Sequence, residues 1–416
     1  MKIVGILFLI CILFGIPINL ISNNSYDAGW TIGEWLVSYQ GGFIRRGLSG
    51  SIIYTLTSNF NINPIFLIWT ISLVLYISLF LLVYKYCKSV FPKYLLFSPI
   101  FLGFPAINNN LIRKDNLLLL AFCSCIILIE LYLNNKITKF YTFCFTNFIS
   151  IIAILNHESY GFWALPILIL LIAITKNKIK NSLFSKIKSA LYFLLPSTII
   201  FILCCLFKGN QEQVNIIHFS WRKFYPLLPS PGNEIFLPQP TGTMSSLAWK
   251  ITDSLKLTLS TFSQFSKFVW IPAAWIITIF ISSLYFINSI SQKKLIELKS
   301  FVLTSEFLIF TPLFIMGVDY GRWIYLWIIS SAMVVSFIER NQKINLSLHP
   351  IYKIYEPLNK FYRNFPFIHK TNIYSYLLLF FGIPGCCWSI FKYIQSTPIG
   401  YLMLCNSLYC PLKNMI

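Results

Sequence analysis

Charged side chains are scarce in this sequence of 416 residues. Only 11% of its residues are Asp, Glu, Lys or Arg, whereas a soluble globular protein carries roughly 25%. Apolar residues make up 56% of the chain, and they fall into repeated runs of about 20 residues, the length of a helix that crosses a bilayer. The deficit of charge therefore argues against an ordinary soluble protein and predicts an all-α polytopic membrane protein.

Common nucleotide- and metal-binding motifs are absent as well. The sequence contains no P-loop, no G-x-G-x-x-G fingerprint and no nucleophile elbow, which argues against an ATP-driven pump and a nicotinamide enzyme. The eleven cysteines show no metal-ligand spacing, and the His-Glu pair at 157–158 lacks the second histidine of a zinc motif. We therefore expect no cofactor, and no motif supports a divalent metal ion.

Acidic residues are much rarer than basic ones. Asp and Glu number 13 against 33 Lys and Arg, which gives a net charge of +20. The basic residues lie in short loops between apolar runs and not on one soluble face. Their excess is therefore typical of cytoplasmic loops in a membrane protein, and we expect no nucleic-acid partner.

The apolar runs predict eleven spans in a single transmembrane domain. A core module at about 1–207 is followed by a long extracytoplasmic loop at 208–267 and by C-terminal spans within 268–416. The third span is short and contains Pro99 and Pro105, so we expect it to be broken or tilted. The predicted spans are 3–22, 62–84, 94–107, 117–134, 140–156, 159–175, 189–207, 268–290, 301–317, 323–338 and 373–395.

The distribution of basic residues predicts a cytoplasmic N-terminus. With this orientation, plain lysine-rich loops face the cytoplasm, and the compact motifs that combine acidic and basic residues all fall on the outer side. We interpret this one-sided placement as the strongest functional signal in the sequence. The five outer motifs lie in 26–50, 113–115, 157–158, 208–267 and 319–322.

The first outer motif predicts an amphipathic helix at 28–40 in the membrane interface. Ile32, Trp35, Leu36 and Tyr39 follow the i, i+3, i+4, i+7 pattern, which places them on one helix face. The opposite face carries polar residues and is expected to face away from the lipid.

The same motif supplies candidate catalytic and phosphate-binding groups. Asp27 is a candidate general base or metal ligand; alternatively, it only caps the helix while Glu34 faces water. The glycines in 41–50 allow close backbone approach. Arg45 and Arg46 present forked donors that suit phosphate oxygens, or they bind lipid headgroups.

The next two motifs add candidates for both roles. Arg113 and Lys114 suit a phosphate group, with Asp115 as a second carboxylate; alternatively, Asp115 only favours a helix dipole and pairs with Arg113. His157 and Glu158 lie in a tight turn at the outer surface, where ionisable groups are functional by default. They suit acid–base catalysis, or the histidine is a structural turn residue.

The last two motifs are the least specific. In the long loop, Trp221 and Arg222 suit glycan binding through aromatic stacking and polar contacts, although a membrane-surface lid or a surface loop without a chemical role fits equally well. Asp319 and Arg322 are close enough to pair across a glycine turn. Either that pair is structural, or Arg322 faces the same cavity as Arg45 and Arg113.

In layout, the chain resembles the integral-membrane glycosyltransferases of the GT-C type and the bacterial O-antigen or capsule polysaccharide polymerases. The resemblance covers roughly residues 1–270. It rests on Asp27 beside an interfacial helix after the first span, on Asp115 in the second outer loop and on the long loop 208–267. The second outer loop has no Asp-x-Asp, which departs from the metal-dependent members of this class.

The resemblance implies a polyprenyl-(di)phosphate-linked sugar donor in the bacterial inner membrane, with the bilayer and other polysaccharide-assembly proteins as partners. A carboxylate or His157 would deprotonate the acceptor hydroxyl, and arginines would stabilise the departing phosphate. The competing interpretation is a transporter or flippase of a lipid-linked or anionic substrate. The clustering of charge at one face, with no repeat between the halves, favours the enzyme.

Overall fold

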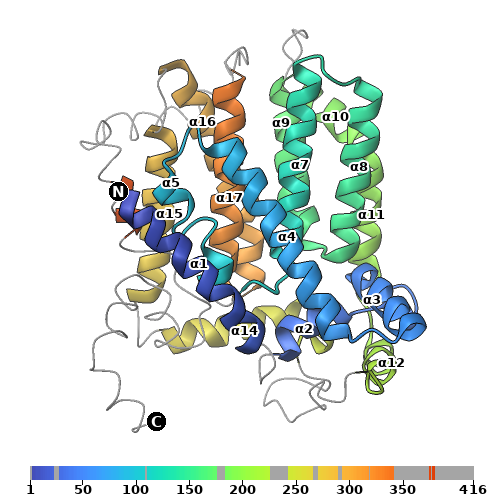
Figure 1. Cartoon of the computed structure of the whole chain (residues 1–416). Helices are drawn as coiled ribbons and strands as arrows, with labels where there is room; N and C mark the ends of the chain where they lie inside the picture. The colour runs from blue at the N-terminus through green and yellow to red at the C-terminus, as the bar shows by residue number, and fades with distance from the viewer. Residues whose placement is uncertain are drawn as a thin grey trace, which may run out of the picture. The chain divides into compact units, whose positions relative to one another are not determined.

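Every regular element in the described part of the chain is a helix (Figure 1). The computed structural model describes residues 2–22, 28–107, 110–175, 183–224, 242–265, 270–288, 293–317, 319–341, 374–375 and 377–379. The prediction of an all-α protein is therefore confirmed for these ranges. Asp27 and most of the predicted span 373–395 lie outside them.

Five helices within the described residues are long and apolar enough to cross a membrane, against the eleven predicted spans. A sixth results if the bent pair α10 (Leu183–Phe193) and α11 (Leu195–Leu206) is one span. The predicted spans 3–22, 159–175 and 268–290 form apolar helices with shorter apolar stretches. The five helical stretches are Pro64–Cys87, Asp115–Leu133, Lys139–Asn156, Leu298–Met316 and Tyr320–Arg340.

The chain forms two compact units that are interleaved in sequence. Unit A comprises 14–82 and 109–253, and unit B comprises 1–13, 83–108 and 254–416. This division differs from the predicted core module and C-terminal spans, because residues before 109 contribute to both units. The helices that cross the boundary are α1 (Lys2–Ser22), α4 (Pro64–Cys87) and α14 (Ile251–Phe265).

Unit A contains a bundle in which α7 (Asp115–Leu133), α8 (Lys139–Asn156) and α9 (Ser159–Thr175) pack together, with α11 against α8 (Figure 1). The start of α8 is capped by Thr138, whose hydroxyl accepts a hydrogen bond from the third residue of the helix. These helices place the short turn between α8 and α9 at one end of the bundle.

A polar clamp explains how unit A tolerates the bend of 77° between α10 and α11. The Asn147 side chain donates to the Phe193 carbonyl at 2.9 Å and accepts from the Ser197 backbone N–H at 3.2 Å. Its oxygen also accepts from the Ser197 hydroxyl at 2.7 Å. Backbone groups freed by a break in an apolar helix need such partners. The predicted continuous span 189–207 is therefore two helices.

A layer of shorter helices lies at the end of the unit A bundle that carries the α8–α9 turn (Figure 1). It consists of α2 (Ala28–Leu36), the 3-10 turn η1 (Tyr39–Gly41), α3 (Gly47–Phe60), α12 (Gln211–Trp221) and α13 (Thr243–Ser246). The predicted loop 208–267 is thus partly helical. Helix α3 was not predicted, because its many small and polar residues do not resemble a span.

The apolar face predicted for the first outer motif is confirmed. Ile32, Trp35 and Leu36 are buried in one cluster with residues of α3 and α12. The polar face does not meet water, however, since Glu34 is only 1% exposed and Thr31 and Ser38 are buried too. Helix α2 is therefore enclosed by protein on both faces, and the alternative in which Glu34 only faces water is wrong.

Close approach by glycine is also confirmed at the contact between α2 and α3. A Cβ added to Gly50 would lie 2.0 Å from the Val37 carbonyl oxygen, which is backbone and cannot move aside cheaply. Arg46, at the start of α3, adopts a left-handed conformation with φ 68°, a conformation that is uncommon for residues with a side chain. The strained residue is one of the predicted phosphate-binding arginines.

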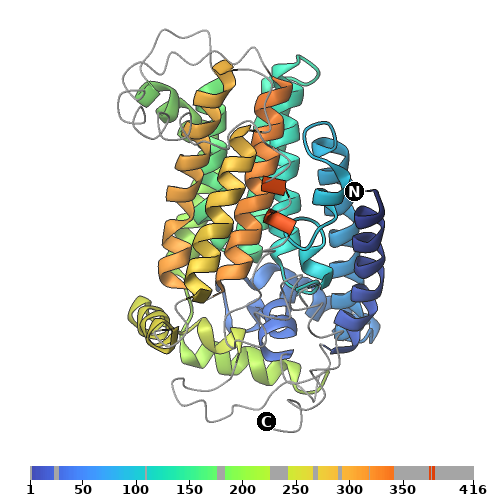
Figure 2. The ribbon, with the colours of Figure 1, turned by 90° about the vertical axis from the view of Figure 1, so that its left-hand side faces the viewer.

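Unit B contains three long helices that pack side by side (Figure 2): α15 (Trp270–Asn288), α16 (Lys293–Met316) and α17 (Tyr320–Arg340). The predicted third span, 94–107, belongs to this unit and is broken as expected. Only α5 (Lys93–Leu96) and α6 (Phe104–Ile107) are helical there. The Phe104 ring of α6 stacks on Tyr325 of α17 at a centroid distance of 4.7 Å.

Candidate functional site

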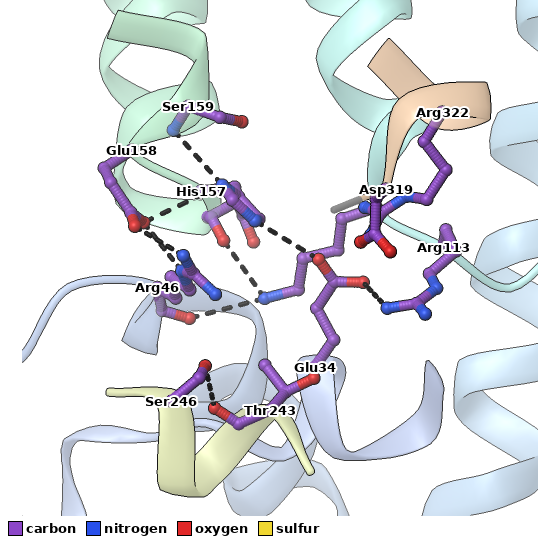
Figure 3. A network of polar contacts seen from close by, with 12 residues as sticks. Glu34, Arg46, Arg113, His157, Glu158, Ser159, Thr243, Ser246, Asp319 and Arg322 are labelled. Carbon is purple, nitrogen blue, oxygen red and sulfur yellow. Dashed lines mark hydrogen bonds and ion pairs between the residues drawn. The ribbon is translucent and has the colours of Figure 1, made fainter. Parts of the chain in front are cut away.

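The acid–base groups of unit A meet where the α8–α9 turn lies beside α2 and the start of α3 (Figure 3). The turn contributes His157 and Glu158, and α2 contributes Glu34. The residues before α3 and α7 contribute the cations. The network joins the first three predicted outer motifs, and its members are Glu34, Arg45, Arg46, Arg113, Lys114, His157 and Glu158.

Glu158 is held by two adjacent guanidinium groups. Arg46 donates from Nε to Oε2 at 2.7 Å and from Nη2 to Oε1 at 2.5 Å, which is a bidentate contact. Arg45 donates from Nη1 to Oε1 at 3.0 Å. Burial raises the pKa of the Glu158 carboxyl, but Arg46 and Arg45 outweigh it and hold that pKa well below its ordinary value. Glu158 is therefore ionised at neutral pH.

Glu34 is the second carboxylate of the network. Its Oε2 lies 3.8 Å from Arg113 Nη1, and its Oε1 lies 3.4 Å from His157 Nε2. Arg113 Nη1 also donates to the Trp30 carbonyl at 2.8 Å, which fixes the guanidinium against α2. These two contacts are longer than those that Arg45 and Arg46 make with Glu158.

The hydrogen bonds of His157 indicate which ring nitrogen carries the proton. The Ser159 backbone N–H donates to Nδ1 at 3.1 Å, so Nδ1 is an acceptor and the neutral ring is protonated on Nε2. The Nε2 proton then points to Glu34. Nδ1 also lies 3.7 Å from Glu158 Oε2. His157 therefore links the two carboxylates.

Lys114 is 0% exposed and binds two backbone segments of the network. Its ammonium donates to the Arg46 carbonyl at 3.3 Å and to the Asn156 carbonyl at 3.2 Å. It also lies over the Trp35 ring, 5.6 Å from the centroid. Burial lowers the pKa of Lys114 to about 7, a fall that Glu34 partly opposes. The residue is therefore partly neutral near physiological pH.

Two indole groups hold α2 in place by binding backbone carbonyls. Trp35 Nε1 donates to the carbonyl of Ile112, just before Arg113 and Lys114. Trp221 Nε1 donates to the Leu36 carbonyl at 2.7 Å. Buried indole groups need such acceptors. These bonds fix the cation-bearing segment and α12 against the helix that carries Glu34.

Helix α13 also packs against α2. The Thr243 hydroxyl donates to the Trp30 carbonyl at 2.9 Å. Arg45 Nη2 donates to the Ser246 carbonyl at 3.2 Å. The long predicted loop therefore reaches the network through α13, and it contributes the Ser246 backbone carbonyl where the sequence predicted the side chains of Trp221 and Arg222.

Several predicted site residues lie in the network, and others do not. The structure brings together Arg45, Arg46, Arg113, Lys114, His157 and Glu158. Asp115 is buried in the first turn of α7, where a carboxylate favours the helix dipole, and its catalytic role stays a prediction. Trp221 is fully buried, so its ring offers no face to a glycan, while Arg222 is exposed.

Asp319 and Arg322 belong to unit B. Arg322 Nη1 donates to Asp319 Oδ2 at 2.6 Å, so the predicted pairing is confirmed. The Arg322 guanidinium also lies over the Trp323 ring, 5.4 Å from the centroid. A shared cavity with Arg45 and Arg113 stays a prediction.

Sequence reasoning missed Glu34 as a central residue. One signal was available, because the polar residues Thr31, Glu34 and Ser38 recur at helical spacing and form a polar stripe beside the apolar one. A single carboxylate on an otherwise uncharged helix face fits a buried partner better than a solvated face. Among the described residues, no group of three or more His, Cys, Asp or Glu is arranged to hold a metal ion.

No protein-family model matches this chain, and no curated protein or solved structure matches it either.

Proposed function

We propose that this chain is a membrane glycosyltransferase that uses a polyprenyl-(di)phosphate-linked sugar or oligosaccharide at the extracytoplasmic face of the bacterial inner membrane. The observation that supports it is the network of unit A, in which four cationic side chains surround two carboxylates. Polymerisation of an O-antigen or capsule polysaccharide is the reaction that best fits the layout resemblance.

The cation excess supports binding of an anionic group. Arg45 keeps 19% of its side chain exposed and Arg113 keeps 13%. The Nε atoms of both arginines are buried without an acceptor among the described residues. Such donors cost free energy when they stay unpaired. A phosphate oxygen would satisfy them and would be stabilised as it gains negative charge.

Glu34 supports the role of general base. The acceptor hydroxyl would attack the anomeric carbon and form the new glycosidic bond, while the bond from that carbon to the phosphate oxygen breaks. The phosphate leaves with the electron pair, and the hydroxyl proton passes to Glu34. His157 orients the carboxylate by donating from Nε2, and Glu158 holds the arginines in place.

The lipid-phosphate part of the proposal is tested by binding. The purified full chain is mixed with undecaprenyl phosphate or with uncharged undecaprenol, and thermal stabilisation is measured in detergent. We expect undecaprenyl phosphate to stabilise the wild type and undecaprenol to leave it unchanged. Undecaprenyl phosphate should stabilise Arg45→Gln less than the wild type. Equal stabilisation by both lipids would refute phosphate recognition.

The glycosyl-transfer part is tested in cells by the length distribution of surface polysaccharide. Single substitutions of Arg45, Arg46, Arg113 and Arg322 are compared at matched expression. Shortened chains are expected for the three arginines of unit A. Full chain length in all four variants would contradict the proposal.

Transport or flipping of a lipid-linked or anionic substrate is the second candidate, and one observation favours it. The bent pair α10–α11 is a broken apolar helix, and broken helices are typical of transporters. Proteoliposomes that contain a fluorescent polyprenyl-phosphate lipid separate the two functions. Lipid movement between leaflets without glycosyl transfer would favour the transporter.

A further inference from the structure

Unit B contains a buried carboxyl group, that of Glu306, which is not part of the network of unit A. Glu306 belongs to the apolar stretch Leu298–Met316 of α16, which is long enough to cross a membrane. Its side chain is 0% exposed. A carboxyl group buried in an apolar membrane helix is costly in free energy and is a functional candidate by default.

The partner of the Glu306 carboxyl group is a hydroxyl group. An ionised carboxylate in an apolar interior would need a cation instead. Ser331 of α17 donates from Oγ to Glu306 Oε2 at 2.7 Å. The other oxygen, Oε1, is buried and has no hydrogen-bond partner among the described residues. A buried carboxylate without a cation is neutralised by a proton. An unpaired polar atom in a protein interior is also a place for a water molecule.

The ion pairs described for α16 and α17 do not involve Glu306. Lys299 lies seven residues earlier on α16, about 10 Å along the helix, and its ammonium contacts Glu339 Oε1 at 2.6 Å. Asp319 and Arg322 pair with each other at the start of α17. The described ion pairs of α16 and α17 therefore exclude Glu306.

We propose that Glu306 is a proton-binding site within the membrane, where Ser331 holds one carboxyl oxygen and the other exchanges its proton through a bound water. A hard metal ion is disfavoured as the occupant, since such ions take about six or more oxygen ligands, whereas one carboxyl and one hydroxyl meet here. Protonation allows the group to stay in an apolar helix, and deprotonation would demand movement of α16 against α17. The site gives unit B a proton-dependent element.

Infrared spectroscopy of the full-length protein in nanodiscs tests this proposal. The carbonyl stretch of a protonated carboxyl is recorded near neutral pH, before and after transfer to D2O, for the wild type, Glu306→Gln and Glu339→Gln. We expect a band that shifts in D2O, weakens at alkaline pH, disappears in Glu306→Gln and persists in Glu339→Gln. A band that Glu306→Gln leaves intact, or one that neither D2O nor pH alters, would overturn it.

Chemical labelling of the wild type keeps the test decisive if Glu306→Gln fails to fold. A hydrophobic carbodiimide takes the proton of a protonated carboxyl and bonds to its oxygen. In the resulting O-acylisourea the acyl group moves from that oxygen to the neighbouring nitrogen, which leaves a stable N-acylurea adduct that mass spectrometry locates. The adduct is expected on Glu306 and not on the ion-paired Glu339. Absence of the adduct from Glu306, with folded protein, would refute the proton site without bearing on the network of unit A.

Discussion

Buried carboxyl groups of units A and B differ in the partners that they meet. In unit A, Glu158 lies between two guanidinium groups and Glu34 lies between Arg113 and His157. In unit B, Glu306 meets only the Ser331 hydroxyl among the described residues. The partner decides the charge, because cations keep a carboxylate ionised while an apolar setting keeps it protonated. Glu158 and Glu306 therefore lie in opposite electrostatic surroundings.

Substitution of Glu158 is expected to have the largest effect on folding. Glu158→Gln leaves Arg45 and Arg46 without their counter-charge in a mostly buried site, which costs about 3 kcal/mol or more of unfolding free energy. Glu306→Gln is the matched control, because an amide can replace a protonated carboxyl there at little cost. Thermal unfolding of both variants in the same detergent measures the difference. Equal losses would contradict the contrast between the units.

Substitution of Glu34 is expected to reduce activity strongly and to change folding less. Loss of a general base lowers the rate about 10²- to 10⁴-fold. Glu34→Gln keeps the shape of the side chain and an acceptor for His157. Glycosyl transfer and thermal unfolding are measured on the same preparation. Retained transfer in a folded Glu34→Gln protein would exclude Glu34 as the base.

Substitution of Arg45 is expected to weaken lipid-phosphate binding without abolishing folding. A charge-assisted hydrogen bond is worth about 1.5–3 kcal/mol, so Arg45→Gln should bind undecaprenyl phosphate roughly 10- to 100-fold more weakly. Lys250→Gln, at an exposed lysine of unit A, serves as the control for general charge loss. The same weakening in both variants would indicate non-specific attraction.

The smallest expected effect is a pH dependence of stability from Lys114. Its folded-state pKa of about 7 lies below the ordinary value of 10.5. Between these values the unfolded chain binds a proton that the folded chain does not, so the free energy of unfolding rises with pH across this window and is flat below it. Lys114→Met removes the titration. The difference in melting temperature between the wild type and this variant should change with pH, and a constant difference would refute the shift.

The sequence predicted the class of fold better than the number of spans. Apolar runs identify helices of membrane length, such as α4 and α7, because composition and length suffice for that decision. They do not show that Asn147 can satisfy the break between α10 and α11, which depends on a contact across 50 residues. Nor do they show that α3, with its small and polar residues, packs against α2 through Gly50.

The arginines and the His-Glu turn of the site were predictable from the sequence, and its central residue, Glu34, was not. Adjacent arginines and a His-Glu turn indicated charge recognition, and the positive-inside rule placed them on one face. Periodicity predicted which residues of α2 share a face, and it could not tell what covers the polar one. The sequence therefore does not single out Glu34, whereas its contacts with Arg113 and His157 place it in the middle of the network.

The contact between Arg45 and the Ser246 carbonyl has a consequence for biogenesis. The two residues are 201 positions apart, so at a synthesis rate of about 5–20 residues per second the partner follows about 10–40 s after the arginine. During that interval Arg45 and Arg46 have been synthesised and α13 has not. A chain interrupted before α13 would carry all the charges of the network and lack the enclosure that orders them.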